Sequence, residues 1–208
     1  LQADVVLDAT TRYFEKQFQF IKASLESGKN VISAGEEAAY PWVKNPDMAK
    51  QINEIAESND VSILGTGTTP AFMTNYLPIT LTGLLNRVNR IVIRRTVDVS
   101  NAGPVVWKEY AFGENVNAAL YQKVNDNDIG GITWREQSEV IARAMDWTID
   151  KYEEISKPMV SKSQRVTETG DIAPGTCCGI NQQVHAYSKN KEIINIDYAM
   201  MVQPSIEE

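Results

Sequence analysis

The chain has 208 residues, of which 43% are hydrophobic and 23% are charged. These values are typical of a globular protein with one or two domains and argue against a disordered or collagen-like chain. The formal net charge of −7 and the absence of a basic cluster argue against nucleic-acid binding. No apolar run reaches the length of a membrane span, no leader opens the chain, and the only two cysteines are adjacent. We therefore expect a cytoplasmic protein without a membrane partner.

The first part of the chain alternates between short apolar strands and helices. Strands are predicted at 4–9, 30–33 and 61–64, and helices at 12–27 and 47–58. This order is typical of a parallel sheet with helical crossovers. The three strands end in the polar turns ATTR, SAGEE and GTGTTP. In parallel strands these turns share one edge of the sheet, which is where open α/β sheets bind their ligands.

The third turn, Gly65 to Pro70, has more backbone freedom than a strand-to-helix connection requires, so we expect a ligand against it. The alternative is a tight connection with Pro70 at the first position of a helix predicted at 71–85. The only G-x-G pattern lies here and lacks the third glycine of a dinucleotide fingerprint. Either the sheet does not bind a nucleotide or its fingerprint lies upstream, and the opening on a buried type of strand favours the second.

Beyond this region the pattern changes to an α+β arrangement. Strands are predicted at 90–97, 105–112, 176–187 and 193–201, and a helix at 134–151. The last two strands are separated by SKNKE, which predicts a hairpin. We therefore predict a partial Rossmann-like domain at 1–87 and an α+β substrate domain at 88–208, incomplete at its C-terminus, with a mainly antiparallel sheet.

Several of these segments together resemble a known family. The runs VVLDATTR, VISAGEEAAYP, GTGTTPAFMTNYLPITLTG and IRRTVDVSNAGP, with the later PMVSKSQRVTETGDIAPGTCCGINQQ, are similar to the 2,4-diaminopentanoate dehydrogenases, within the dihydrodipicolinate reductase-like amine dehydrogenases. The resemblance implies a central portion of an NAD- or NADP-dependent homo-oligomer that lacks the N-terminal Rossmann fingerprint. It implies oxidative deamination of 2,4-diaminopentanoate to 2-amino-4-oxopentanoate and ammonia, a step of ornithine degradation. The alternatives are another diamino-acid or amine dehydrogenase, or a non-catalytic oligomerisation or binding module.

The resemblance assigns the catalytic role to Glu36 or Glu37, in the SAGEE turn. Hydride leaves an amine carbon only after the ammonium group has lost a proton, and a carboxylate can accept that proton and then stabilise the iminium cation. The alternative is that both glutamates only favour a helix N-terminus. Tyr40 is expected to orient the carboxylate in the substrate site, or simply to pack.

Other roles follow from the same resemblance. The cofactor is expected to contact Thr10, Thr11, Gly65, Thr66, Gly67, Thr69 and Pro70. The alternative for the first two threonines is helix capping. At residues 69–71 the chain has Thr-Pro-Ala where many relatives have Asn-Pro-Gly.

Charged residues of the second half are the remaining candidates. Arg95 and Asp98 are substrate-binding candidates, and strand alternation places Arg94 on the face opposite Arg95. We expect His185 to be structural and the adjacent cysteines to be close-packed rather than nucleophilic, and we expect no metal.

Overall fold

The computed structural model describes residues 2–126 and 133–204. They form two compact units, of which the first comprises Leu1–Val88 and Thr133–Ile149 and the second comprises Asn89–Ile132 and Asp150–Glu208. The first boundary lies one residue from the predicted position. The return of Thr133–Ile149 to the first unit differs from the single predicted boundary, because the helix in this segment packs against Thr68–Tyr76 of that unit.

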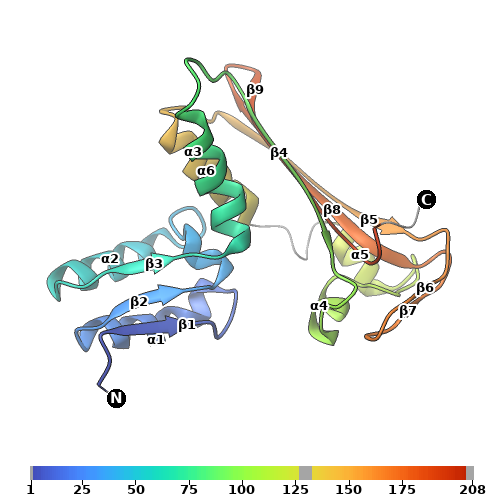
Figure 1. Cartoon of the computed structure of the whole chain (residues 1–208), viewed down its shortest axis with the longest axis horizontal. Helices are drawn as coiled ribbons and strands as arrows, with labels where there is room; N and C mark the ends of the chain where they lie inside the picture. Colours follow the sequence, from blue (N-terminus) through green and yellow to red (C-terminus); the bar gives the residue numbers. More distant parts are fainter. Residues whose placement is uncertain (1, 127–132, 205–208) are drawn as a thin grey trace. The chain divides into compact units, whose positions relative to one another are not determined.

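The first unit contains a parallel sheet of three strands in the order β1-β2-β3 (Figure 1). The elements in chain order are β1 (Val5–Asp8), α1 (Phe14–Glu26), β2 (Asn30–Ser33), α2 (Pro46–Ser58) and β3 (Ile63–Gly65). This is the predicted sequence of strands and helices, and the predicted bounds of β2 are those observed. The α/β fold class is therefore confirmed for this unit.

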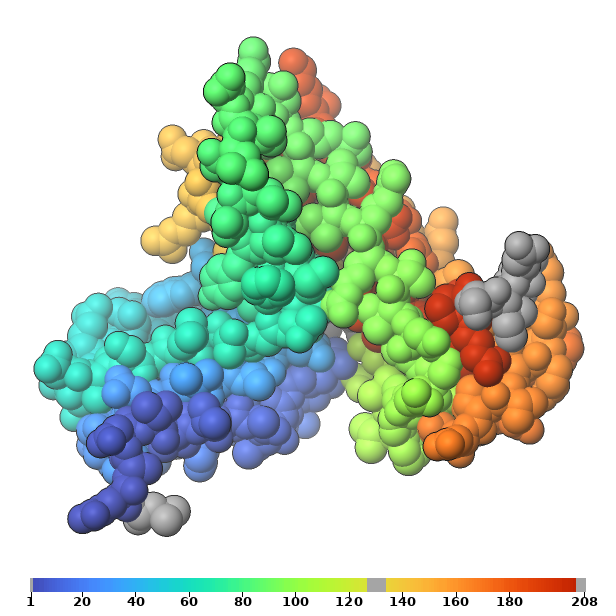
Figure 2. Space-filling model, in the orientation of Figure 1, coloured from blue at the N-terminus to red at the C-terminus, as the bar shows by residue number. Residues whose placement is uncertain are grey.

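Both helices cover the same face of this sheet. Right-handed crossovers between strands added in sequence order place their helices on one side, and α1 packs against α2. On α1 the buried stripe includes Phe18, Ile21 and Leu25. The opposite face is open among the described residues, since Leu7 is 74% exposed and Leu64 is 48% exposed. Figure 2 shows the atoms of β1 (dark blue) at the surface.

The predicted helix at 71–85 is wrong in its bounds. The chain forms a wide turn of π-helical type, η2 (Thr68–Tyr76), followed by the short helix α3 (Leu77–Thr82). Pro70 is extended, with ψ 173°, and Ala71 has φ 103°, so regular helix cannot begin before Phe72. A positive φ of this size is unfavourable for Ala71, which has a side chain.

We predict that Ala71→Gly stabilises the protein. The substitution removes backbone strain, and the benefit exceeds the loss of one buried methyl group, so the free energy of unfolding rises by about 1 kcal/mol. Ala56→Gly is the control, because Ala56 lies inside α2 at an ordinary helical position and the same change there costs about 1 kcal/mol. Chemical denaturation compares the two. Destabilisation by both substitutions would contradict the strained backbone at Ala71.

The second unit contains a mixed sheet with the strand order β4-β9-β8-β5. β4 is parallel to β9, and the other two pairs are antiparallel, so the predicted mainly antiparallel sheet is confirmed. The β8–β9 hairpin is confirmed as well. The strands are β4 (Ile91–Asp98), β5 (Lys151–Val160), β8 (Cys177–Ser188) and β9 (Lys191–Met201), and a small ladder joins β6 (Arg165–Val166) to β7 (Asp171–Ile172).

The prediction of a strand at 105–112 is wrong. The segment forms α4 (Pro104–Glu109), with Gly103 extended before it and Pro104 at its start. The adjacent valines suggested a strand, whereas the buried residues Trp107, Tyr110 and Ala111 follow helical spacing. A second short helix, α5 (Ala119–Asn125), belongs to the same unit.

The predicted helix at 134–151 is also wrong at its end. Helix α6 (Thr133–Ala144) ends seven residues earlier, and Lys151 begins β5, a strand that the sequence did not predict. β5 lies at the edge of the sheet and pairs only with β8. An edge strand tolerates charged residues and Pro158, which is why its pattern was not that of a buried strand.

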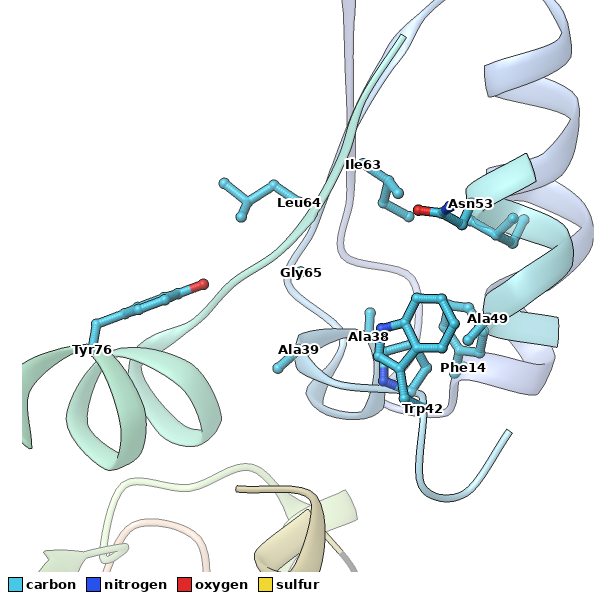
Figure 3. Close-up of a pocket in the computed structure, with 12 residues that line it drawn as sticks. Phe14, Ala38, Ala39, Trp42, Ala49, Asn53, Ile63, Leu64, Gly65 and Tyr76 are labelled. Atoms are coloured by element: carbon cyan, nitrogen blue, oxygen red, sulfur yellow. The ribbon is translucent and has the colours of Figure 1, made fainter. Parts of the chain in front are cut away.

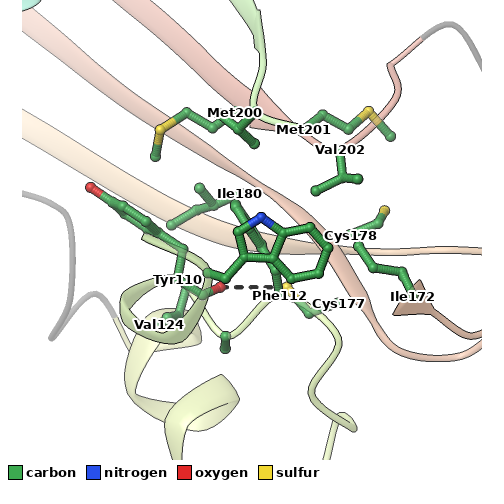
Figure 4. Close-up of a cluster of buried hydrophobic side chains, with 13 residues drawn as sticks. Tyr110, Phe112, Val124, Ile172, Cys177, Cys178, Ile180, Met200, Met201 and Val202 are labelled. Atoms are coloured by element: carbon green, nitrogen blue, oxygen red, sulfur yellow. Dashed lines mark hydrogen bonds between the residues drawn. The ribbon is translucent and has the colours of Figure 1, made fainter. Parts of the chain in front are cut away.

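The core of the second unit forms around the two cysteines (Figure 4). Cys177 and Cys178 are fully buried, and the Cys177 thiol donates to the carbonyl of Tyr110. Burial raises the pKa of the Cys177 thiol to about 12, so the thiolate is not available as a nucleophile. The close-packed role expected for the cysteines is confirmed. Among the described residues, none of the helices is long and apolar enough to cross a membrane.

Candidate functional site

The polar turns that follow the three parallel strands meet at the carboxyl edge of the first sheet. The backbone N–H of Ala34 donates to the carbonyl of Asp8, and that of Thr66 donates to the carbonyl of Ser33, each at 2.8 Å. These bonds continue the strand pairing into the turns. The edge predicted to hold a ligand therefore exists as one continuous surface of the first unit.

Glu37 is held inside this edge by the 3₁₀ turn η1 (Glu36–Ala39). Its side chain is buried, and the residue is only 4% exposed. The Oε2 atom accepts a hydrogen bond of 2.9 Å from the backbone N–H of Phe14, the first residue of α1, while Oε1 pairs with the Lys44 ammonium. The carboxylate therefore joins the helix start, the 3₁₀ turn and the segment before α2.

Glu36 lies on the outer side of the same turn. Its side chain is 38% exposed, and its Oε2 atom lies 3.6 Å from Nε of Arg12. The sequence could not separate the two glutamates, whereas the structure places only Glu37 in the interior. A surface ion pair of this kind contributes little to stability.

Glu136 is a buried carboxyl group that the sequence analysis did not identify. It lies in the first turn of α6 and is 1% exposed, and neither carboxyl oxygen has a hydrogen-bond partner of ordinary geometry in the described chain. Burial, and secondly the charge of Glu37, raise its pKa to about 8 against a smaller lowering by Lys44. The sequence did contain a sign that Glu136 is buried, because it lies four residues before Val140, which belongs to the apolar stripe of the helix.

Thr10 and Thr11 make hydrogen bonds with residues close to them in the sequence. The backbone N–H and the hydroxyl of Thr10 donate to Oδ1 of Asp8, at 3.0 and 2.7 Å. Oγ1 of Thr11 accepts a hydrogen bond of 3.4 Å from the backbone N–H of Tyr13, the N-cap residue of α1. This bond closes a turn before the helix and does not cap it, because the N–H of Phe14, the first helical residue, is bonded by Glu37.

The two glycines of the third turn occupy their positions for different physical reasons. A Cβ atom on Gly65 would lie 1.8 Å from the carbonyl oxygen of Ala38, so the close approach of β3 to η1 accounts for this glycine without a cofactor. Gly67 has φ 155°, a region that favours glycine. Beside it, the hydroxyl oxygen of Thr69 is buried without a hydrogen-bond partner among the described residues, and Pro70 is buried.

We predict that Gly65→Ala strongly destabilises the first unit. The new methyl group must displace the backbone of η1, and overpacking against backbone costs about 3 kcal/mol. Gly103→Ala is the control, since no heavy atom lies within 4 Å of the added Cβ and the φ of Gly103 is −68°. Circular dichroism during denaturant unfolding measures both. Equal stability of the two variants would contradict the close approach at Gly65.

A cavity of about 250 Å³ adjoins Gly65 (Figure 3). Figure 3 shows Trp42 beside Phe14 and Ala49, with Tyr76 on the other side of Gly65. None of its described lining residues is charged. The Tyr76 phenol lines the cavity, whereas the Glu37 and Glu136 carboxyl groups are not among its lining residues.

The remaining predicted residues are divided between the two units. Tyr40 follows η1 and is half-buried in the first unit. Arg95 and Asp98 lie on β4 in the second unit. Arg95 is half-buried with its guanidinium carbon 5.8 Å from the centre of the Tyr198 ring, and Arg94 is exposed, as strand alternation predicted.

Asp98 and His185 have local partners. The Asp98 carboxylate accepts hydrogen bonds from the hydroxyl and N–H of Ser100, the first of which lowers its pKa most, so it serves the turn after β4. Nδ1 of His185 lies 3.0 Å from Oε2 of Glu192, within the polar face of the β8–β9 hairpin. Among the described residues, no group of three His, Cys, Asp or Glu side chains could hold a metal ion.

The two sheets define the class of fold. An amine dehydrogenase from Mycobacterium smegmatis has the same fold, with a TM-score of 0.82 and 18% sequence identity, over 98% of this chain and 60% of that one. The class is thus a Rossmann-like α/β sheet followed by a second unit with a mixed sheet.

The sequence comparisons identify the family. The sequence model of the 2,4-diaminopentanoate dehydrogenase C-terminal domain matches residues 72–208. A 2,4-diaminopentanoate dehydrogenase from Acetoanaerobium sticklandii is 32% identical over 204 residues, which are 97% of this chain and 58% of that protein. The chain belongs to the 2,4-diaminopentanoate dehydrogenase family. It spans less than two thirds of the length of this curated relative.

Proposed function

We propose that the protein is an NAD- or NADP-dependent dehydrogenase that oxidatively deaminates 2,4-diaminopentanoate at C4, giving 2-amino-4-oxopentanoate and ammonia. The observation that carries the proposal is the buried Glu37 carboxylate at the carboxyl edge of the parallel sheet. Family membership supports an amine as the substrate, and the fold supports this edge as the binding site.

Glu37 is suited to hold positive charge on the substrate nitrogen. In a buried site a fixed carboxylate interacts with a cation more strongly than it does in water. Its bonds to Phe14 and Lys44 fix its position before substrate arrives, so little reorganisation is needed during the reaction. The same carboxylate faces the ammonium group before the reaction and the iminium group after hydride has left. Water then adds to the iminium carbon and ammonia leaves.

The described residues fit the nicotinamide end of the cofactor. Gly67 has no side chain, and the buried Thr69 hydroxyl has no partner among the described residues, so this turn can approach and bond a ring amide. We propose that Thr66, Gly67, Thr69 and Pro70 hold this end, with Thr10 and Thr11 nearer the ribose. A bound nicotinamide nucleotide would supply the hydride acceptor. No G-x-G-x-x-G pyrophosphate turn occurs in the 208 residues.

The further expectations also remain proposals. We propose that the protein works as a cytoplasmic homo-oligomer in ornithine degradation, because the resemblance implies these properties. The half-buried Arg95 is proposed as the partner of the substrate carboxylate, since its Nη1 atom is buried without a hydrogen-bond partner among the described residues.

The test is the absorbance of reduced nicotinamide at alkaline pH. The chain and the longest protein product that contains it are each supplied with NAD or NADP and with 2,4-diaminopentanoate, other diamino acids or simple amines. We expect 2,4-diaminopentanoate to give the highest kcat/KM. Faster turnover of another amine would keep the chemistry and reject the substrate. Cofactor binding without turnover of any amine would reject the proposed reaction.

A further inference from the structure

Glu136 is an ionisable group buried without the partners that such groups ordinarily have. Its exposure is 1%, and within the described chain neither carboxyl oxygen makes a hydrogen bond of ordinary geometry. The backbone N–H and the ammonium of Lys44 both act to lower its pKa, but burial outweighs them. Buried polar groups are nearly always satisfied, and an exception of this kind calls for a role. Hydrophobic packing would be served better by an apolar residue at this position in α6.

The surroundings of Glu136 include the site at the sheet edge. The η2 turn packs against both η1 and α6, and the side-chain amide of Asn75 donates to the Gln137 carbonyl at 2.9 Å. The first turn of α6 is thereby fixed within the first unit. The charges of Glu37 and Lys44 both act on the Glu136 carboxyl.

The net charge of the cluster formed by Glu37, Lys44 and Glu136 favours the binding of one cation. Glu37 and Lys44 are paired and cancel, so an ionised Glu136 gives the cluster a charge of −1. Other charged groups on the elements packed here are Asp8 at the end of β1, and Glu36 of η1, which pairs with Arg12. Helix α6 itself adds Arg135, Glu139 and Arg143. The η2 turn carries no charged residue, and its only titratable side chain is Tyr76. The ammonium group of the substrate would restore neutrality.

We propose that Glu136 is the group that receives the proton from the substrate ammonium, while Glu37 holds the positive charge that remains on the nitrogen during hydride departure. This inference rests on the proposed function. The proton moves from R–NH₃⁺ to the Glu136 carboxylate, giving R–NH₂ and a neutral carboxylic acid. The C–H bond then breaks with its electron pair, which reduces the nicotinamide nucleotide, and the nitrogen lone pair forms the C=N bond of the iminium.

The two carboxyl groups differ in their suitability as a base. An alkylammonium group has a pKa of about 10.4, roughly six units above that of an ordinary glutamate, so an ordinary carboxylate is a weak acceptor. The pKa of Glu136, raised to about 8 mainly by burial, reduces this gap to about two units. Glu37, in contrast, has both carboxyl oxygens engaged already, one by the Phe14 N–H and the other by the Lys44 ammonium.

The first test uses the chain itself and needs no turnover. Side-chain ¹³C-labelled glutamates are followed by NMR from about pH 4 to 10 in the wild type, Glu136→Gln and Glu37→Gln, a range that spans the ordinary and raised values. We expect one glutamate to titrate far above the others, to vanish in Glu136→Gln, and to titrate at lower pH in Glu37→Gln because a neighbouring negative charge has gone. Ordinary titration of every glutamate would overturn the inference. Glutamine has the shape of the protonated acid, so the fold is expected to persist.

The second test is the pH profile of amine oxidation by the longest protein product. Because Glu136 must be ionised to accept a proton, kcat/KM should rise with pH through about 8. In Glu136→Gln we expect this rise to vanish and kcat/KM at about pH 9 to fall by about 100-fold or more. Glu139→Gln, on the same helix, is the control and should keep the wild-type profile.

The outcomes separate the two proposals. An active wild type whose pH profile is unchanged in Glu136→Gln overturns the role of Glu136 and leaves the proposed function intact. A wild type that oxidises none of the amines overturns the proposed function and the acceptor role together, and the NMR titration still reports the buried carboxyl. A rise of kcat/KM with pH that occurs in the wild type and in Glu139→Gln, and is lost only in Glu136→Gln, supports both proposals.

Discussion

Glu37→Gln is expected to lower kcat/KM for amine oxidation by about 10²- to 10⁴-fold, with little change in the fold. The amide keeps an oxygen that can accept from the Phe14 N–H, but it removes the negative charge that we propose acts on the substrate nitrogen. The loss should appear mainly in kcat, because the iminium cation forms during the chemical step. Initial rates of nicotinamide reduction measure it.

Glu36→Gln is the matched control for this prediction. It makes the same chemical change one residue away, on a side chain that is 38% exposed and has its Oε2 atom 3.6 Å from Nε of Arg12. We expect its kcat/KM to remain within about threefold of the wild type, because an exposed charge contributes little to a screened site. A large loss in Glu36→Gln with a normal Glu37→Gln would reverse the assignment of the two glutamates.

Arg165→Met is expected to lower the free energy of unfolding of the second unit by about 3–5 kcal/mol. Arg165 is completely buried. Its Nε donates to the hydroxyl of Ser161 at 2.7 Å, and its Nη1 donates to the carbonyls of Val202 and Gln203 at 2.6 and 2.7 Å. Methionine fills much of the same volume and leaves these three acceptors without their donor.

The measurement for Arg165 is chemical denaturation followed by tryptophan fluorescence, since Trp107 belongs to the same core. Arg94→Met is the control, because Arg94 is exposed on β4 and its replacement should change stability by less than about 0.5 kcal/mol. Arg165→Lys should fall between the two, as lysine keeps the charge without the planar fork. Similar stability of Arg165→Met and the wild type would contradict a structural role for this arginine.

The parallel half of the fold could be predicted because its signals are local. The stripe of Phe18, Ile21 and Leu25 identifies α1, and a run of apolar residues between polar turns identifies β2. The edge strand β5 and the short helix α4 were not predicted, because these segments are stabilised by the elements they pack against and not by a local sequence pattern. Lys151–Val160 is stabilised by pairing with β8 rather than by its own apolar residues.

The site was predictable only in part. The position of Glu36 and Glu37 at a strand end could be read from the sequence, but which one faces inward depends on the orientation of a 3₁₀ turn. Glu136 lies about a hundred residues further along the chain, and only packing of α6 on η2 brings it beside the sheet edge. Gly65 was predicted to admit a ligand, and the sequence could not show that a Cβ atom there would also meet the Ala38 carbonyl oxygen.

The most direct measurement of the central claim is isotope transfer from 2,4-diaminopentanoate that carries deuterium on C4. The longest protein product that contains this chain is incubated with this substrate and the oxidised cofactor, and the reduced nicotinamide is analysed by mass spectrometry. We expect the reduced cofactor to gain the deuterium and the carbon product to be 2-amino-4-oxopentanoate. Reduced cofactor without deuterium, or a product oxidised at C2, would contradict the proposed reaction.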